Sequence, residues 1–240
     1  LRYFCDGLKP DFFLVGETLH GDYNQWVNGE MLHSCTNYEC YKGLYSALNS
    51  MNLFEIVHSL KRQYGPEQWT LYKGKHLLCF ADNHDVTRAA SILQNPAHLP
   101  LMYGILFGMP GIPCVYYGSE WGALGDKSQG DDALRPCFDG PEWNELTGAI
   151  AAMAKAHQES EALCWGDFQD LVLTNKQTVF QRRTDGERVL VAVNADSQPF
   201  TAHFDAGCGR AVDLITGQDH DFGGGSELPP YSVFFWKCER

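Results

Sequence analysis

The chain lacks several features that would assign it at once to a functional class. No run approaches the ~18 consecutive apolar residues that a membrane span requires. No stripe of lysine and arginine occurs, and the formal net charge of -12 disfavours a nucleic-acid partner, because an acidic surface repels phosphate backbones. There is no C-x-x-C pair and no Cys/His spacing typical of zinc. What remains is a globular chain with enough apolar residues for a core.

Cysteine usage indicates a reducing compartment. The nine cysteines are an odd number, and some of them, such as Cys79 and Cys114, stand inside apolar runs where a thiol behaves as a small hydrophobe. We therefore expect a cytoplasmic protein. The chain opens on Leu1, without a methionine, in what reads as the end of an amphipathic helix formed by Leu1, Phe4 and Leu8. We expect it to be a piece of a longer protein.

Residues 1–162 alternate short apolar strands with helical stretches. Strands are predicted at 11–17, 35–38, 75–82 and 112–118, and helices around 40–64, 96–109 and 142–158. Strands buried on both faces and separated by helices predict a parallel α/β sheet.

The pattern changes after about residue 165. Short strands are predicted at 171–174, 178–182, 189–193, 200–204, 211–215 and 232–236, with turn residues between them. This spacing is typical of an antiparallel β-domain. We therefore divide the chain into an α/β unit at 1–162 and an all-β antiparallel sandwich at 163–240.

Polar side chains follow the ends of the predicted parallel strands, namely Glu17, Asn37, Asp82 to Asp85, and Glu120. In a barrel of parallel strands, this edge carries the chemistry. Any one of these residues is as easily an ordinary loop residue. Four such positions in succession favour a site.

Two segments contain candidate catalytic groups. Glu17 ends an apolar strand, where few waters would surround its carboxylate, and this favours the protonated form that a general acid needs. Adjacent His84 and Asp85 are suited to gripping sugar hydroxyls, and Arg88 is placed to hold Asp85 ionised. The alternatives are a strand-end glutamate and a solvated loop with an internal ion pair.

Together these segments resemble the α-amylase family of glycoside hydrolases. Gly16-Glu17 matches the family's strand-five motif, and Asn37-Tyr38 matches the end of its strand six. Asn83-His84-Asp85, followed by Arg88, matches the strand-seven motif, and residues 110–120 match the strand-eight segment. Residues 189–194 look like a strand of the family's C-terminal domain. The resemblance implies the second half of a (β/α)8 TIM barrel, strands five to eight, followed by the antiparallel domain.

The resemblance also implies a role for each matching residue. Glu17 would be the general acid/base and Asp85 the aspartate that stabilises the transition state, while His84, Asn83 and Arg88 would bind substrate. The details resemble the cyclomaltodextrinase/neopullulanase-like branch, through His20 and Trp26 after the acid and through Asp132 and Arg135 in a D-x-x-R-P loop. Leu134 stands where that loop often has a second arginine. Tyr38, Trp26 and Trp121 are candidates for stacking on sugar rings.

The implied activity is that of a retaining α-glycoside hydrolase acting on α-glucans, malto-oligosaccharides or cyclodextrins. The family's nucleophile lies on strand four in a G-x-R-x-D segment, and no such segment precedes Glu17. We therefore expect the N-terminal half of the barrel to be missing and the fragment alone to be inactive. No cofactor is required. Ca²⁺ bound by Glu120 and Asp126 is left open, since two carboxylates do not complete a site.

Two other functions stay open at this point. A transglycosylase of the same family would share every motif. A non-catalytic, amylase-like protein that binds glucan or serves as a partner subunit would have no reason to keep Glu17 and Asp85. A homodimer is also left open.

Overall fold

Four short parallel strands follow one another in sequence order. In the computed structural model, which describes residues 1–239, β1 (Val15–Gly16) pairs with β2 (Ser34–Cys35), and β3 (Leu78–Phe80) pairs with β4 (Ile112–Cys114). A single parallel bridge between Thr36 and Leu78 connects the two pairs. The predicted parallel arrangement is confirmed, with strands shorter than expected.

Helices connect these strands and cover them. They are α1 (Arg2–Leu8), α2 (Tyr38–Asn49), α3 (Phe54–Tyr64), α4 (Ala89–Ile92), α5 (Leu99–Gly108), α6 (Asp131–Leu134), α7 (Glu145–Glu159) and α8 (Glu161–Trp165). The helical stretch expected around 40–64 is two helices. The break falls at Met51, whose positive φ of 52° ends the first helix before α3 begins.

The second half of the chain forms an antiparallel sheet. Its strands are β5 (Asp167–Leu173), β6 (Gln177–Arg183), β7 (Arg188–Asn194), β9 (Arg210–Asp213), β10 (Asp219–Asp221) and β12 (Ser232–Cys238), in the order β10-β9-β12-β7-β6-β5. A separate two-stranded sheet pairs β8 (Phe200–Ala202) with β11 (Ser226–Leu228). The antiparallel prediction is confirmed, and the sandwich is unequal because its second sheet has only these two strands.

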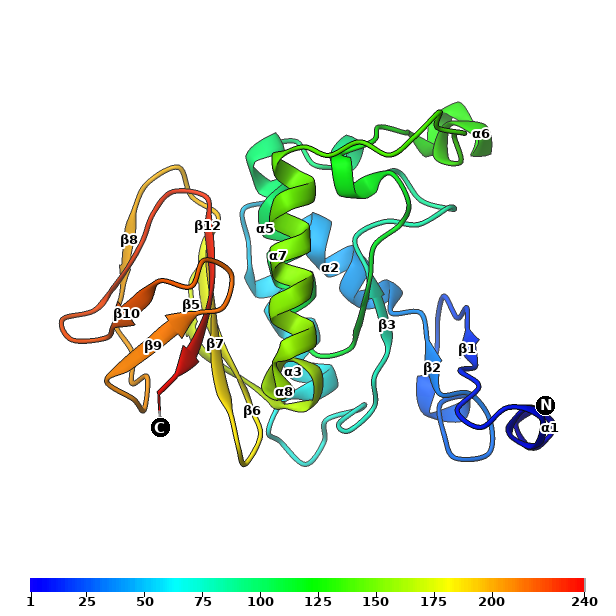
Figure 1. Cartoon of the computed structure of the whole chain (residues 1–240), viewed down its shortest axis with the longest axis horizontal. Coiled ribbons are helices and arrows are strands. Elements are labelled where there is room, and N and C mark those ends of the chain that lie inside the picture. The colour runs from blue at the N-terminus through cyan, green and yellow to red at the C-terminus, as the bar shows by residue number, and fades with distance from the viewer. Residues whose placement is uncertain (240) are drawn as a thin grey trace.

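Helices α5 and α7 stand between the antiparallel sheet and the parallel strands (Figure 1). Helix α5 is apolar all round, as expected for a helix covered on both sides. Its glycines allow close approach to the sheet: a Cβ on Gly104 would lie 2.6 Å from Val233, and one on Gly108 would lie 2.7 Å from Val191. The main core therefore runs continuously from the parallel strands through α5 into the sheet.

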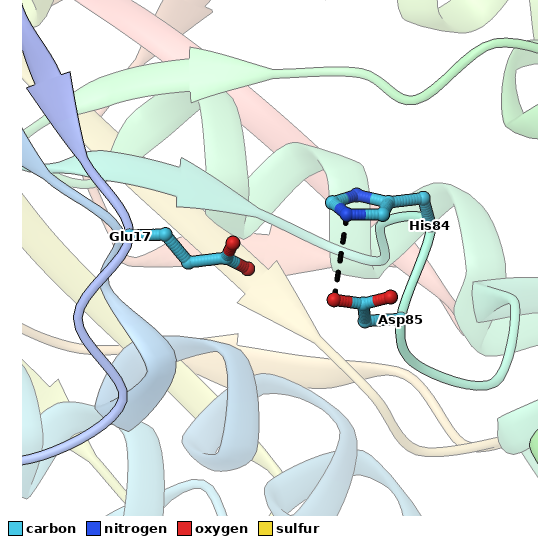
Figure 2. A group of neighbouring side chains, drawn as sticks. All are labelled: Glu17, His84 and Asp85. Atoms are coloured by element: carbon cyan, nitrogen blue, oxygen red, sulfur yellow. Dashed lines mark ion pairs between the residues drawn. The ribbon is translucent and has the colours of Figure 1, made fainter.

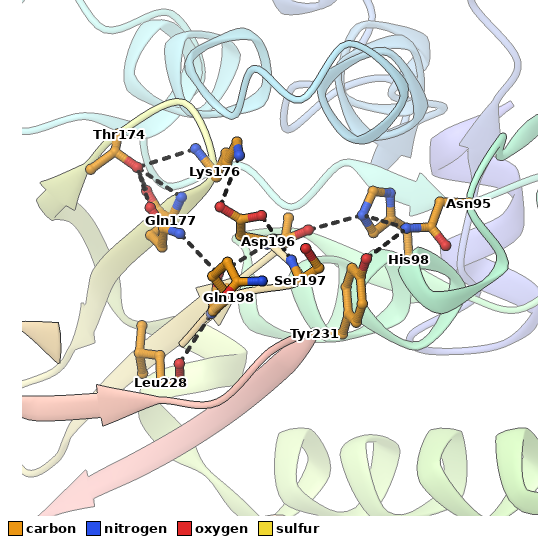
Figure 3. Close-up of polar contacts among 12 residues, drawn as sticks. Asn95, His98, Thr174, Lys176, Gln177, Asp196, Ser197, Gln198, Leu228 and Tyr231 are labelled. Atoms are coloured by element: carbon orange, nitrogen blue, oxygen red, sulfur yellow. Dashed lines mark hydrogen bonds and ion pairs between the residues drawn. The ribbon is translucent and has the colours of Figure 1, made fainter. Parts of the chain in front are cut away.

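Polar contacts also join the helices to the sheet (Figure 3). Buried His98, just before α5, places Nε2 3.0 Å from the carbonyl oxygen of Ala195. Asn95 donates to the hydroxyl of Tyr231 at 3.4 Å. These contacts fix the sheet against the α/β unit, which carries the candidate site.

The N-terminal segment exposes apolar side chains. Helix α1 buries no residue, and Phe12, Phe13 and Val15 are 43%, 48% and 44% exposed. The expectation that residues 11–17 are buried on both faces is therefore wrong for this chain. Within residues 1–239, β1 pairs only with β2, and no strand pairs with its other edge. No helix within residues 1–239 is both long and apolar enough to cross a membrane.

Candidate active site

Three side chains from two strand ends meet at one point. Glu17 follows β1, and His84 and Asp85 follow β3, so the parallel strands deliver all three to the same edge. One oxygen or nitrogen atom from each lies within 4.8 Å of those from the other two. In Figure 2 the carboxylate of Glu17 points towards His84 and Asp85. The sequence prediction that these residues share a site agrees with this geometry.

Tyr38 connects Glu17 to the strand-seven segment. Its hydroxyl donates to Glu17 Oε1 at 2.9 Å and accepts from Asn83 Nδ2 at 3.0 Å. Asn83 Oδ1 in turn accepts from the backbone N–H of Asp85 at 2.8 Å. Desolvation raises the pKa of Tyr38, so its hydroxyl stays protonated and available as a donor. Tyr38, predicted only as a stacking residue, therefore positions the carboxylate of Glu17.

Asp85 is held by Arg135. Arg135 Nη2 donates to Asp85 Oδ1 at 2.7 Å, and its Nε donates to the carbonyl oxygen of His84 at 3.1 Å. On the other oxygen of Asp85, His84 Nε2 lies 3.3 Å away. A guanidinium and an imidazole therefore flank one carboxylate and fix its orientation.

Arg88 does not pair with Asp85, so that prediction is wrong. Its side chain is fully buried and donates to the carbonyl oxygens of Tyr117 and Leu134 and, at 3.0 Å, to the hydroxyl of Ser119. A buried guanidinium cannot touch a sugar, which also removes Arg88 from the substrate-binding set. Because Leu134 immediately precedes Arg135, Arg88 instead fixes the loop that presents Arg135 to Asp85.

Asp82 holds together the loops that contain Ala89 and Ser119 through buried hydrogen bonds. It is 2% exposed, and its carboxylate accepts from the N–H of Ala89 at 2.7 Å and from the hydroxyl of Ser119 at 2.8 Å. Burial raises the pKa of Asp82, and these hydrogen bonds oppose the rise. Asp82 therefore belongs to the scaffold of the site.

An aromatic groove adjoins Glu17. It has a volume of about 510 Å³, and His20 and Tyr38 line it together with Tyr41, Tyr45 and others. His20 is exposed and lines this groove, and its predicted contact with substrate stays a prediction. Tyr41 and Tyr45 were missed by sequence reasoning, since they lie on α2, where helical spacing makes an aromatic residue look like core.

The remaining predicted residues lie outside the cluster. Trp26 is 43% exposed at the end of a 3₁₀ turn, and Trp121 packs edge-on against Phe138 with ring centroids 5.1 Å apart. Asp132 lies in α6 and joins the site only through its carbonyl oxygen, which accepts from the N–H of Arg135 at 3.3 Å. Within residues 1–239, no hydrogen bond links these three side chains to Glu17.

Glu17, His84 and Asp85 form the one group of three potential metal ligands within the described part of the chain. Glu120 and Asp126, the expected calcium residues, join no such group there. Arg135 forms an ion pair with Asp85 at 2.7 Å, and this cation disfavours a metal ion at the same carboxylate. The arrangement is better suited to acid–base chemistry on a neutral substrate.

The comparisons with known proteins agree with this geometry. A family model described as alpha amylase, catalytic domain, matches residues 1–189. A cyclomaltodextrinase of Geobacillus thermopakistaniensis (strain MAS1) is 25% identical over 99% of this chain and 42% of its own length. An intracellular maltogenic amylase of Bacillus subtilis (strain 168) is 24% identical over 76% of this chain and 32% of its own. The chain thus spans less than half the length of these relatives.

Solved structures show the same fold. An Anoxybacillus α-amylase superposes with a TM-score of 0.85 at 22% identity, covering 99% of this chain and 54% of its own. A Geobacillus thermoleovorans α-amylase complexed with acarbose gives a TM-score of 0.85 at 21% identity, covering 100% and 56%. The family match covers most of the chain and includes both candidate carboxylates. The chain therefore belongs to the α-amylase family.

Proposed function

We propose that the protein carrying this chain is a retaining α-glycoside hydrolase that acts on α-glucans, malto-oligosaccharides or cyclodextrins. The observation that carries the proposal is the convergence of Glu17, His84 and Asp85 within 4.8 Å of one another. Each carboxylate has its own partner, Tyr38 for Glu17 and Arg135 for Asp85. Paired carboxylates with different surroundings can take different roles in glycoside cleavage.

Glu17 is assigned the role of general acid and base. It protonates the leaving glycosidic oxygen and later takes a proton from the attacking water, as retaining enzymes require. The hydroxyl of Tyr38, 2.9 Å away, fixes one carboxylate oxygen and leaves the other free for the substrate. Glu17 is exposed within the described residues, so the expectation that few waters surround its carboxylate is wrong for this chain. Exposure suits a group that must meet a polymer from solvent.

Asp85 and His84 are assigned to the sugar ring at the cleavage point. The carboxylate of Asp85, oriented by Arg135, favours the positive charge that develops on the ring in the transition state. His84 hydrogen-bonds the same sugar. Asn83 holds both the backbone of Asp85 and the hydroxyl of Tyr38, so it couples the two carboxylates.

We propose further that residues 1–162 are strands five to eight of a (β/α)8 barrel and that 163–240 form a separate C-terminal domain. The parallel order β1 to β4, with the edge of β1 beyond β2 unpaired within residues 1–239, supports the half-barrel. The exposed apolar side chains of α1 and of residues 12–15 would then be buried by the other half. The nucleophile would come from that half.

The substrate class is supported by the names of the relatives, which include a cyclomaltodextrinase and an intracellular maltogenic amylase. A cyclomaltodextrin glucanotransferase of Paenibacillus macerans is 23% identical over 61% of this chain, which keeps transglycosylation as a second candidate. All nine cysteines are free, in keeping with the reducing interior of the cell.

Product analysis tests this proposal. The protein is incubated with maltotriose, and the anomeric proton signals of new reducing ends are followed by ¹H NMR before they mutarotate. The proposal predicts that the α-anomer appears first, as expected for retention. Initial release of the β-anomer, or no release of sugar at all, would refute it. Repeating the assay with excess maltose separates hydrolysis from transfer, since transfer yields longer oligosaccharides.

A further inference from the structure

An exposed tryptophan lies over a second cavity, away from the Glu17 cluster. Trp165 ends α8 and is 68% exposed. It lines a cavity of about 530 Å³ together with residues of β5 and β6. A single exposed aromatic ring is not unusual in itself, so its surroundings must decide whether it binds anything.

The indole ring is held in place from one side. The ring of His76 meets it edge-on, with centroids 4.7 Å apart and planes at 75°. Burial lowers the pKa of His76, so this neighbour is neutral at neutral pH. The ring of Trp165 is thus supported while most of its surface faces solvent, and a ligand would lose little entropy in ordering it.

Beside the indole ring of Trp165, strands β5 and β6 present polar side chains to the cavity. The register pairs Asp167 with Arg183 and Gln169 with Gln181. Phe168, between the two β5 residues, is 2% exposed and points into the core. Because side chains alternate along a strand, these four polar residues all point outward beside Trp165.

The two glutamines are arranged to bind hydroxyl groups. Gln181 Nε2 donates to Gln169 Oε1 at 2.7 Å, which orients both amides. Gln181 Oε1 has no hydrogen-bond partner within residues 1–239. That oxygen is buried, so the group offered to a ligand is the amide of exposed Gln169, whose Nε2 can donate to a hydroxyl group.

The charges of the cavity favour a neutral ligand. Lys73 and Arg183 are balanced by Asp167 and Asp185. This balance offers no net attraction to a phosphate or a cationic peptide. The polar lining equally disfavours a wholly apolar molecule. A pyranose ring meets both conditions, because its C–H face stacks on an aromatic ring while its hydroxyls bind amides and carboxylates.

We propose that Trp165 and the outward face of β5 and β6 form a second, non-catalytic binding site for an α-glucan chain. The identity of the sugar rests on the proposed function. The site is separate from the catalytic cluster, because His76, which supports Trp165, precedes β3, whereas His84 and Asp85 follow it at the other end of the strand. Figure 1 likewise shows α8 at the end of α7 remote from α6. The site would anchor one stretch of a polymer while another stretch reaches Glu17.

Fluorine NMR tests this site directly. The protein that carries this chain is prepared as Glu17→Gln, so that it does not consume its ligand, and is labelled with 5-fluorotryptophan. The resonance of Trp165 is assigned with Trp165→Phe. Titration with maltoheptaose should shift this resonance saturably. The resonance of Trp143, which is 77% exposed but does not line this cavity, should stay in place and serves as the internal control.

The outcomes separate the second site from the proposed function. If the Trp165 resonance stays fixed while the parent enzyme turns over maltoheptaose, the second site is refuted and the glycosidase proposal stands. If the resonance shifts but the parent enzyme has no turnover, glucan binding at Trp165 is supported and the catalytic proposal fails. If neither occurs, both are refuted.

Retention on amylopectin gels provides a second measurement. In the Glu17→Gln background, Trp165→Ala should raise the dissociation constant for amylopectin about tenfold, as loss of a central aromatic contact commonly does. Trp165→Tyr should recover part of the affinity, and Trp143→Ala should leave it unchanged. Equal retention of Trp165→Ala and its parent, with unchanged circular dichroism, would overturn the proposal.

Discussion

Removing the hydroxyl of Tyr38 should slow catalysis without weakening substrate binding. That hydroxyl is the bridge between Glu17, 2.9 Å away, and Asn83, 3.0 Å away. In Tyr38→Phe the aromatic ring stays, with its edge-on contacts to Tyr41 and Phe80. Only the two hydrogen bonds are lost, so the substitution separates positioning of the acid from stacking on the sugar.

The size of the effect follows from the exposure of Glu17. A hydrogen bond to a charged group contributes about 1.5–3 kcal/mol. Glu17 is exposed, so water replaces part of this contribution, and we take the lower end of the range. A loss of about 1.4 kcal/mol corresponds to a tenfold fall in kcat. KM should change by less than about twofold, because the lost contact orients a catalytic group and does not bind the ground state.

Steady-state kinetics on maltotriose measures both constants. Tyr45→Phe is the matched control, since Tyr45 lines the same groove but has no hydrogen bond to Glu17 within the described residues. The double variant Tyr38→Phe/Asn83→Ala should lose less than the product of the single losses, because the two residues share one bond. An unchanged kcat in Tyr38→Phe, or a raised KM alone, would refute the positioning role.

Three further predictions concern the surroundings of the site and the fold. Arg135→Ala should lower kcat/KM on maltotriose about tenfold, because the cation beside Asp85 is lost. A kcat/KM within twofold of the parent would contradict this. Gly108→Ala should lower the free energy of unfolding by about 1–3 kcal/mol in urea titrations, because its Cβ would overlap Val191, whereas Gly209→Ala meets no atom within 4 Å and should be neutral. Desolvation raises the pKa of Glu187, but hydrogen bonds from a backbone N–H, a lysine and a serine outweigh it and lower that pKa overall. Its contribution is therefore present at neutral pH and lost as the pH falls through the lowered pKa, so Glu187→Gln should destabilise by about 1–2 kcal/mol at pH 7 and by progressively less on acidification.

The sequence was sufficient to locate the two carboxylates. Strand-end position drew attention to Glu17 and Asp85, because parallel strands deliver their C-terminal ends to one edge whatever the exact strand lengths. The resemblance to the α-amylase family selected these two residues, and the roles it implies stay predictions. The sequence was also sufficient for the antiparallel character of the second half. The sequence pattern did not predict β10 (Asp219–Asp221). This strand is short and polar, and it lies at the edge of the sheet, where no hydrophobic alternation is required.

Ion-pair and hydrogen-bond partners that lie far apart along the chain could not be predicted from the sequence. Arg88 was paired with Asp85 because it lies three residues away, yet its side chain turns inward towards Ser119 and the carbonyl oxygen of Leu134. The actual partner, Arg135, lies 50 residues further along the chain. Apolar composition likewise indicates that a segment prefers burial but not what covers it, so Phe13 was expected inside and is 48% exposed.

The proposed catalytic role of Glu17 is tested most directly by the turnover of Glu17→Gln in the protein that carries this chain. The substitution keeps the shape of the side chain and removes its ability to give and take a proton. We expect a fall in kcat of about 10³-fold or more on maltotriose, with an unchanged unfolding midpoint. Glu55→Gln, which removes a carboxylate on α3, outside the cluster, is the control. A kcat for Glu17→Gln within a few-fold of the parent would contradict the assignment of Glu17 as the catalytic acid.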